Sequence, residues 1–301
     1  MMRVIVAHCA VVMGTVFMAH FAVIMGTVVM GTVIAAVHRT GAVLCRAVAK
    51  FIGVVNAIIY YWSFVFHLLT LPLLLSNPMR SGLLTWHNTT MQITKLEHAC
   101  LVLEHEGKKI IIDPGFYTRP MTDQSDVLAV VITHKHDDHC FEGQLDRILQ
   151  NNPGVQILGT NEVCDRLTGY STTAVHHGDY YQVGPFSLEF FGDMHAEIHR
   201  SIPLIQNCGV LVNGQLYYPG DSFTRPDRQV EILACPSSAP WLKISEVIDF
   251  VADVKPKRSF ATHNIHLSNE GHELNNSRIQ ATTEANGGSF EFLLPGEITT
   301  V

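Results

Sequence analysis

The sequence predicts a layered α/β sandwich over residues 91–301, preceded by an apolar segment over residues 1–90 that could contain one or two transmembrane helices. Three observations support this division. Short β-rich runs separated by turn residues fill the second part, and helical stretches lie between them. A content of 47% hydrophobic and 16% charged residues is enough to bury a core. The same composition excludes a disordered or collagen-like chain.

Ten apolar runs rich in β-forming residues are expected to be strands. They are Ala99–Leu103, Lys109–Ile112, Val127–Ile132, Val155–Leu158, Phe186–Phe191, Val210–Val212, Gln215–Tyr218, Ile232–Ala234, Ser259–Ala261 and Ser289–Leu293.

Helical signals are fewer. An amphipathic helix that ends near Pro256 is predicted by apolar residues at i, i+3, i+4 and i+7, namely Ile244, Val247, Ile248 and Val251. Shorter helices are expected over residues 141–150 and 161–167. Because no linker interrupts the sequence after Met91, we expect one domain there.

Charge divides the chain at about residue 90. Residues 1–90 contain five basic residues and no Asp or Glu, which gives them a formal charge of +5. The remaining 15 basic and 27 acidic residues give residues 91–301 a charge of −12. A nucleic-acid-binding surface needs clustered Lys and Arg, so this balance disfavours a nucleic-acid partner.

Two uncharged stretches in the first part, Val4–Val37 and Phe51–Leu75, each exceed the ~20 residues that a helix needs to cross a bilayer. Membrane association would therefore involve residues 4–75. The basic residues between the stretches favour a cytoplasmic loop, which would place the second part of the chain outside. Two alternatives remain open: a real two-helix anchor, or a leader foreign to a native protein that starts at Met91.

The seven cysteines contain no CxxC pair, and most lie among apolar neighbours, as is typical of reduced core thiols. They indicate a reducing compartment, in conflict with the topology from the basic loop. We expect a cytoplasmic domain, anchored to the membrane if the leader is real.

The residues that can carry chemistry follow directly after the apolar run 127–132. They have the pattern H-x-H-x-D-H, formed by His134, His136, Asp138 and His139. Three imidazoles and a carboxylate on a loop at a strand end can converge on a metal ion. The absence of thiolates favours a catalytic site over a closed structural one. The alternative is a charged surface loop with incidental histidines.

This motif resembles that of the metallo-β-lactamase fold superfamily, and the resemblance covers nearly all of residues 91–301. Four further residues that follow apolar runs match the superfamily pattern in order: Asp113, His195, Asp221 and His263. The segment 239–243, Ala-Pro-Trp-Leu-Lys, is similar to the Gly-Pro-Trp-Leu-Lys of the branch that includes ascorbate-6-phosphate lactonase-like hydrolases, with Ala239 in place of the glycine. The implied fold is an αββα sandwich in which Asp113 supports the histidine loop.

The resemblance also implies a centre of two divalent metal ions, zinc in the first place, with manganese or iron as alternatives. The first ion would be held by His134, His136 and His195. The second would be held by Asp138, His139 and His263. Asp221 would bridge the two. Such ions lower the pKa of a bound water from 15.7 towards ~7, so the implied reaction is attack by a metal-bound hydroxide.

Two residues are candidates for catalytic roles beside the metals. Asp138 could orient the attacking hydroxide or carry a proton to the leaving group. His199, four residues after His195, could contact the substrate or a metal ligand, or it could make only a structural hydrogen bond.

Other polar side chains have weaker assignments. His98 could face the site or pack within a strand, His266 is expected on the rim of the site, and His176 and His177 are expected in a turn. Three arginines could bind a carboxylate or phosphate, although solvated loop charge is the favoured interpretation: Arg200, Arg225 and Arg228.

The expected function is hydrolysis of an ester, lactone or phosphodiester bond of a small metabolite, because a metal site of this kind defines the reaction class and leaves the substrate open. A phosphodiesterase or nuclease of the same fold is an alternative, as is a non-catalytic membrane-anchored metal-binding protein, which would have lost ligands that are all present here. A redox member with two irons would partner a flavin-binding domain, for which residues after 293 leave no room.

A chain that begins at Met91 should fold and retain activity, because the first expected strand and every expected ligand follow that residue. The measurements are the soluble yield, metal content and rate of the fragment 91–301 beside those of the full chain. An insoluble, metal-free fragment would make residues 1–90 part of the fold.

Overall fold

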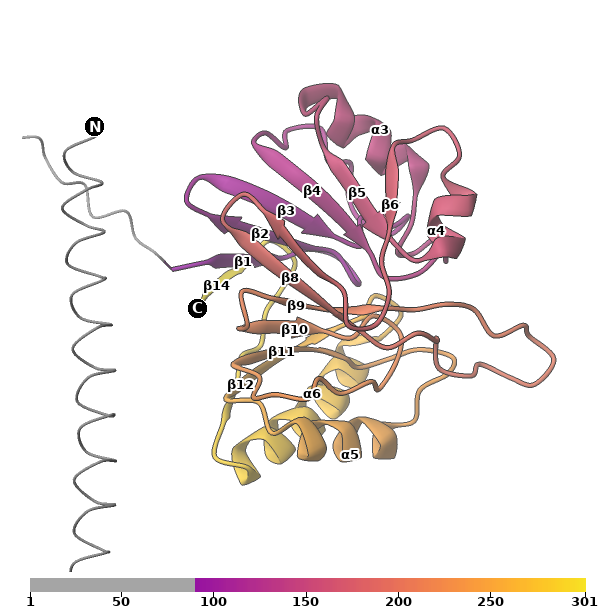
Figure 1. The fold of residues 1–301 in the computed structure, drawn as a ribbon. Coiled ribbons are helices and arrows are strands. Elements are labelled where there is room, and N and C mark those ends of the chain that lie inside the picture. The colour runs from indigo at the N-terminus through magenta and orange to yellow at the C-terminus, as the bar shows by residue number, and fades with distance from the viewer. Residues whose placement is uncertain (1–89) are drawn as a thin grey trace, which may run out of the picture. The chain divides into compact units, whose positions relative to one another are not determined.

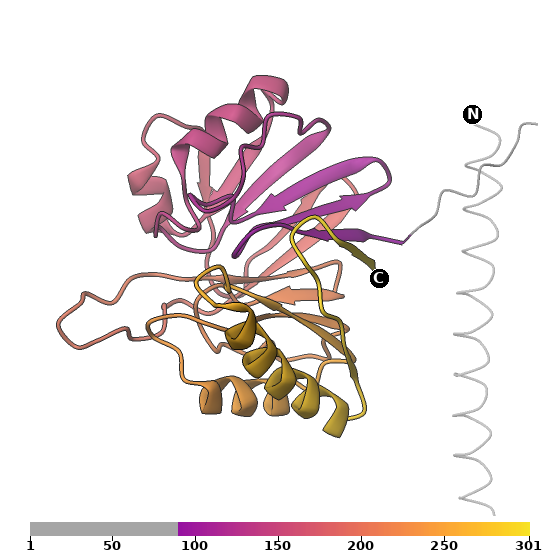
Figure 2. The same cartoon turned by 180° about the vertical axis from the view of Figure 1, so that it is seen from behind.

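The computed structural model describes residues 90–301, in which two β-sheets lie face to face and carry helices on their outer sides (Figures 1 and 2). The expected anchor, and its alternative as a foreign leader, fall on residues outside this described part. Between residues 90 and 301, no helix is both long enough and apolar enough to cross a membrane.

The first sheet consists of seven strands: β1 (Gln92–Lys95), β2 (Leu101–His105), β3 (Lys108–Ile112), β4 (Val127–Ile132), β5 (Gln156–Gly159), β6 (Thr172–Ala174) and β14 (Ile298–Thr300). Their spatial order is β14-β1-β2-β3-β4-β5-β6. The strands are antiparallel from β14 to β3 and parallel from β3 to β6.

The second sheet also has seven strands: β7 (Tyr180–Val183), β8 (Phe186–Phe191), β9 (Gly209–Val212), β10 (Leu216–Tyr218), β11 (Ile232–Pro236), β12 (Arg258–Thr262) and β13 (Ser289–Phe290). The order is β13-β12-β11-β10-β9-β8-β7, antiparallel from β7 to β10 and parallel from β10 to β13. Each sheet thus combines an antiparallel half with a parallel half.

Two helices cover the outer face of each sheet (Figures 1 and 2). The first sheet carries α3 (Glu142–Asn151) and α4 (Asn161–Arg166), and the second carries α5 (Ile244–Val254) and α6 (Asn269–Ala285). The layers are therefore helix, sheet, sheet, helix, which is the arrangement that the sequence predicts.

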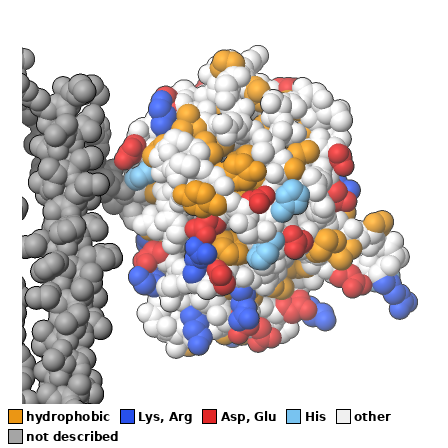
Figure 3. Space-filling model, viewed as in Figure 1, with side chains coloured by type: hydrophobic (Ala, Val, Ile, Leu, Met, Phe, Trp, Pro, Cys, Tyr) orange, Lys and Arg blue, Asp and Glu red, His pale blue; other side chains and the backbone are white. Residues whose placement is uncertain are grey.

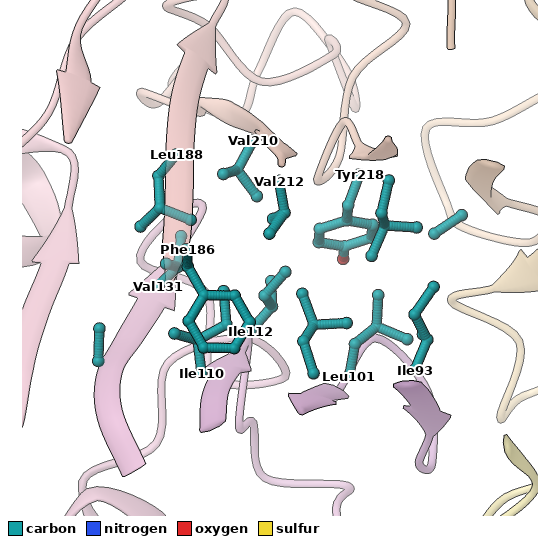
Figure 4. Close-up of a cluster of buried hydrophobic side chains, with 14 of the residues drawn as sticks. Ile93, Leu101, Ile110, Ile112, Val131, Phe186, Leu188, Val210, Val212 and Tyr218 are labelled. Atoms are coloured by element: carbon teal, nitrogen blue, oxygen red, sulfur yellow. The ribbon is translucent and has the colours of Figure 1, made fainter. Parts of the chain in front are cut away.

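The core between the sheets is built from side chains at alternate strand positions (Figure 4). In β3, Ile110 and Ile112 face this core, whereas Ile111 packs in the cluster that includes Leu145 and Ile148 of α3. Both faces of a parallel strand are buried in such a sandwich, so these strands are apolar at almost every position. This explains why the central strands were readily predicted from the sequence.

All ten expected strands occur, with ends shifted by at most three residues, and the three expected helices occur as α3, α4 and α5. Four strands were missed: β1, β6, β7 and β14. These strands are short. β6, β7 and β14 are edge strands and β1 lies next to an edge, where polar residues are tolerated. Helix α6 was not predicted because it lacks an apolar face. Of its three buried side chains only Ile279 is apolar, and the other two are Asn276 and Thr283.

The cysteines in the described part are free thiols, as expected. Cys100, Cys140, Cys208 and Cys235 are buried, and Cys164 is half-buried. Burial raises the pKa of the Cys140 thiol to about 12, so this residue, which follows the histidine motif, is neither a thiolate nor a reactive nucleophile at neutral pH.

Glycine is required where the loop after β3 passes the histidine loop. A Cβ at Gly115 would lie 1.7 Å from the backbone oxygen of Asp138, which is backbone and cannot rotate away. The two loops can therefore approach each other only because residue 115 has no side chain.

Gly115→Ala should destabilise the domain by about 1–3 kcal/mol and weaken metal binding, because the histidine loop must shift to admit the methyl group. Gly154→Ala is the matched control, since a Cβ there meets nothing within 4 Å. Thermal unfolding and metal content would be measured for both variants. Equal melting temperatures would show that the loop contact is not constrained in this way.

Candidate metal centre

The polar residues of the expected site lie together at one edge of the sandwich, each just beyond the end of a strand. Asp113 follows β3, the histidine motif follows β4, Asp221 follows β10 and His263 follows β12. His195 lies in the loop after β8. The two sheets are joined at this edge by a hydrogen bond from the Cys208 amide to the Thr133 carbonyl, at 3.0 Å.

Asp113 supports the histidine loop, as the resemblance implies. This fully buried carboxylate accepts hydrogen bonds from the Thr133 amide at 2.8 Å and from the Thr133 hydroxyl at 2.7 Å. His139 Nδ1 lies 2.7 Å from Asp113 Oδ2. Because a carboxylate only accepts, Nδ1 carries the proton and His139 Nε2 is left as a lone-pair donor facing the site.

The same reasoning applies to His134. Its Nδ1 lies 3.1 Å from the Thr133 hydroxyl, whose single proton is already given to Asp113. The hydroxyl must therefore accept from His134 Nδ1, which leaves His134 Nε2 free to bind a metal. One buried aspartate thus determines which nitrogen of two histidines faces the site.

Three histidines expected to hold the first metal are together. His134, His136 and His195 each offer a ring nitrogen, and these atoms lie within 4.8 Å of one another. His134 Nε2 is 3.1 Å from His136 Nδ1. The residues come from the loop after β4 and from the loop after β8, so both sheets contribute.

The residues expected at the second metal form an adjoining group. Asp138, His139 and His263 offer ligand atoms within 4.8 Å of one another, and His98 belongs to the same group. His263 Nδ1 bonds the Ser238 carbonyl at 2.6 Å, so His263 Nε2 also faces the site.

Asp221 lies between the two groups. Its Oδ1 is 3.3 Å from His139 Nε2, and its Oδ2 is 3.5 Å from His195 Nε2 and 3.1 Å from His263 Nε2. Gly220, at φ 64°, makes the turn before it, where a Cβ would collide with Thr133 and Asn207. The position is the one that a bridging carboxylate would occupy, although the role itself stays a prediction.

The charges at the centre attract a cation. Burial would raise the pKa of Asp221, but His263, His139 and His195 outweigh it and hold this pKa well below its usual range. Burial likewise opposes ionisation of Asp138, whose pKa is nevertheless held below its usual range by the neighbouring His263 and His98. Both carboxylates are therefore ionised at neutral pH.

Several atoms of the site are buried and have no hydrogen-bond partner within the described residues. They are His139 Nε2, His195 Nε2, His263 Nε2 and Asp221 Oδ1. A buried polar atom without a hydrogen-bond partner costs roughly 1–3 kcal/mol. Four such atoms around one point therefore indicate that they share a ligand. Imidazole and carboxylate donors suit Zn²⁺, Mn²⁺ or Fe²⁺, and the residues therefore fit divalent metal ions.

His98 faces the site instead of packing within a strand. It lies in the turn between β1 and β2, and its Nε2 is 3.0 Å from Asp138 Oδ2. The Ile265 amide points at His98 Nδ1 at 3.5 Å, so the proton sits on Nε2 and is donated to Asp138. Burial lowers the pKa of His98 to about 4, which keeps the ring neutral. His98 therefore orients Asp138.

The backbone is strained at three of these positions. His98, Asp113 and His263 have φ values of 57°, 47° and 53°, in the left-handed region that non-glycine residues rarely adopt. Such strain costs roughly 1–3 kcal/mol per residue and concentrates at functional sites. Its presence at three residues facing one centre supports a functional role for that centre.

Trp241 and Arg166 belong to the site, yet neither was predicted to act there. The Trp241 indole donates to Asp221 Oδ2 at 2.8 Å from the turn before α5. Arg166 bonds the Lys135 carbonyl and pairs with Asp137 and Glu142 at 2.8 and 3.0 Å, which fastens the outer side of the histidine loop. Trp241 lies in segment 239–243, which resembles a known motif, so a role at the site could have been suspected. No pattern in the sequence pointed to Arg166.

The structure does not bring His199 to the metal groups. His199 is exposed in the loop after β8, and its Nδ1 is 2.7 Å from the Ser201 hydroxyl. Its catalytic role stays a prediction. His266 lines the site pocket as expected, and His177 lies in a turn, where its ring accepts a hydrogen bond from the Gly192 amide at 3.1 Å.

The three arginines considered for anion binding lie elsewhere. Arg225 pairs with Asp253 at 3.3 Å and Arg228 with Glu189 at 2.6 Å. Arg200 is exposed and does not line the metal pocket.

Comparisons with known proteins agree with this geometry. The sequence model of the Beta-lactamase superfamily domain matches residues 92–263. Protein Rv0786c of Mycobacterium tuberculosis is 34% identical over 178 residues, covering 58% of this chain and 84% of the relative. A UPF0173 metal-dependent hydrolase of Carboxydothermus hydrogenoformans is 28% identical over 193 residues, with coverage of 58% and 84%.

Solved structures share the fold. Igni18, a metallo hydrolase of the archaeon Ignicoccus hospitalis, superposes with a TM-score of 0.55 at 19% identity, over 71% of this chain and 99% of that one. CmlA, a diiron beta-hydroxylase of Streptomyces venezuelae, gives a TM-score of 0.53 at 13% identity, over 70% and 54%. At these identities the likeness shows the fold alone.

Asp221→Ala should abolish turnover and leave the fold intact, because it removes a negative side chain that contacts both groups of ligands. His134→Ala should lose at least one metal ion. His177→Ala is the matched control and should keep its metal content, with activity within a few-fold. Metal stoichiometry and rate would be measured for all three. Full metal content in Asp221→Ala together with metal loss in His177→Ala would contradict the ligand assignment.

Proposed function

This chain belongs to the beta-lactamase superfamily as a metal-dependent hydrolase of the metallo-β-lactamase fold, and from that premise we propose that its buried centre cleaves an ester or lactone bond of a small metabolite. The proposal of an ester or lactone bond rests on the pocket over the metal centre. This pocket of about 410 Å³ is lined by no Lys or Arg among the described residues.

The volume fits a small molecule. Ligand pockets of drug-sized compounds span roughly 300–1,000 Å³, so this one lies near the lower end. Apolar side chains form much of its wall beside the ligands: Phe116, Tyr117, Ile198, Pro240 and Trp241. We infer a substrate with an apolar part next to the bond that is cut.

A phosphodiester in a nucleic acid is the weaker alternative. Its phosphates need several cationic side chains, whereas the pocket offers none and residues 91–301 carry a charge of −12. On the face drawn in Figure 3, Lys and Arg lie dispersed among acidic side chains without forming a stripe. The substrate panel described below distinguishes cleavage of a small phosphodiester from cleavage of an ester.

The side chains divide the work as follows. Two divalent ions bound at the two groups would lower the pKa of a water and polarise the oxygen under attack. Asp138 is the residue placed to accept a hydrogen bond from the attacking water and to hold its proton, because it is ionised and partly open to the pocket. His98 keeps Asp138 in place, and Trp241 does the same for Asp221.

We propose zinc as the metal, because the donors are histidine and aspartate without thiolate, a set used at hydrolytic zinc centres. Iron and manganese accept the same donors, and a diiron enzyme shares the fold. Five free thiols, four of them buried, support a reducing compartment, which we take to be the cytoplasm.

The test combines metal analysis with a substrate panel on the purified full chain. The panel contains a p-nitrophenyl ester, a γ-lactone, a thioester and bis-p-nitrophenyl phosphate. We expect about two metal ions per chain and faster turnover of the ester or lactone than of the phosphodiester. Asp138→Asn should lower kcat by roughly 10²–10⁴-fold, the usual contribution of a positioned acid or base.

The outcomes separate the alternatives. Turnover of the phosphodiester alone would replace the proposed substrate class. Equal rates for the Asp138→Asn variant and the native chain would remove Asp138 from the reaction. A chain that binds metal but turns over none of the four compounds would favour a non-catalytic metal-binding protein.

A further inference from the structure

A second and larger pocket lies on the other side of His98 from the metal centre. It measures about 910 Å³ and is bounded by the β1–β2 turn, one side of α6 and the segment 290–295. None of its lining residues lines the metal pocket. Of its lining residues, the proposed function uses only His98, which bonds Asp138 on the metal side.

Lys95 lines this pocket although its side chain is almost entirely buried, with 1% of its surface exposed. It is the last residue of β1 and lies on the same face of the strand as the core residue Ile93. Its Nζ donates one hydrogen bond, to the Leu96 carbonyl at 3.2 Å. An ammonium group has three donors, so two remain for a ligand.

No carboxylate within residues 90–301 lies within 4.0 Å of the Lys95 ammonium. Glu97, two residues away, instead pairs with Arg119 at 2.5 Å. Burial lowers the pKa of Lys95 to about 8, so the ammonium is less stable here than in water although it is still the main form at neutral pH. An anion bound beside it would offset this cost.

Asn276 of α6 supplies a second polar group to the pocket. It is 7% exposed, and its Oδ1 is buried without a hydrogen-bond partner among the described residues. Its amide can present either a donor or an acceptor to a ligand, depending on its rotation. A buried cation and a buried, unsatisfied amide therefore face the same cavity.

The exposed part of the pocket wall combines polar and apolar side chains, and three of the apolar ones are large. Ile265, Phe292 and Leu294 line it and are 40%, 55% and 52% exposed. Small-molecule pockets combine apolar side chains with a few polar groups that orient the ligand. Glu97 and Glu273 also line the pocket, and their negative charge disfavours an anion with more than one charge.

We propose that this pocket binds an organic monocarboxylate with an apolar body. The carboxylate would accept hydrogen bonds from Lys95 and Asn276, and the apolar body would pack against Ile265, Phe292 and Leu294. The pocket adjoins the metal centre through His98 but shares no lining residue with the metal pocket, and the proposal does not depend on which bond that centre cuts.

The probe is octanoate, compared with octanamide, which has the same length and no charge. Binding of each to the purified, metal-loaded full chain would be measured by calorimetry. Octanoate should bind about tenfold to a hundredfold more tightly than octanamide, as expected for a hydrogen bond that gains a charge. In Lys95→Met this preference should disappear, while the affinity for octanamide stays similar.

Two surface variants serve if Lys95→Met does not fold, and they also locate the ligand. Phe292→Ala removes an exposed ring from the mouth of the proposed pocket and should weaken binding of both probes severalfold. Phe116→Ala removes a comparably exposed ring, 59% against 55%, from the metal pocket and should leave both affinities unchanged. Lys257→Met, at a lysine exposed elsewhere, controls for net charge.

Equal affinities for octanoate and octanamide in the native chain would overturn the proposal. So would a loss of octanoate binding in Phe116→Ala but not in Phe292→Ala, because the carboxylate would then lie at the metal centre. Failure of the ester and lactone panel, by contrast, would leave this site untouched.

Discussion

The Asp113 carboxylate is the group on which the arrangement of the site depends. It is fully buried, it follows directly after β3, and it accepts from both donors of Thr133 and from His139. These bonds attach the end of β4 to the end of β3 and orient two rings of the histidine motif. A buried carboxylate is costly unless every lone pair is used, so the loop cannot change shape without leaving this charge unsatisfied. The donors that face the centre are in this sense pre-organised by the fold.

The layered fold could be predicted because its central strands carry clear apolar patterns. Val127–Ile132 is apolar at every position, and Phe186–Phe191 alternates buried apolar residues with the half-buried Ser187 and Glu189, so both were located to the residue. The edge strands and α6 could not be predicted in the same way. β14 gains its order from pairing with β1, which is a contact between positions about two hundred residues apart. α6 is mostly polar and is recognisable only from the sheet that it covers.

In the site, too, features that depend on nearby residues could be predicted, and features that depend on contacts between distant positions could not. The seven residues expected as ligands follow strands in a specific order of residue types, and the structure brings all seven together, while their role as ligands stays a prediction. What the sequence could not show is how they are oriented. Trp241 acts on a carboxylate twenty positions before it, and His98 on one forty positions after it. His199 had the spacing of a site residue, but its loop carries the ring towards Ser201 instead.

The pairing of β14 with β1 has a consequence for how the chain is made. The first strand of the domain is synthesised about two hundred residues before its neighbour on one side, Ile298–Thr300. During translation β1 therefore presents an unpaired edge, which is a template for association with other chains. The backbone of Lys95 is also held by residues 296 and 297, so the wall of the larger pocket is completed only at that late stage. The growing chain consequently keeps this edge of β1 open to association until β14 has been synthesised.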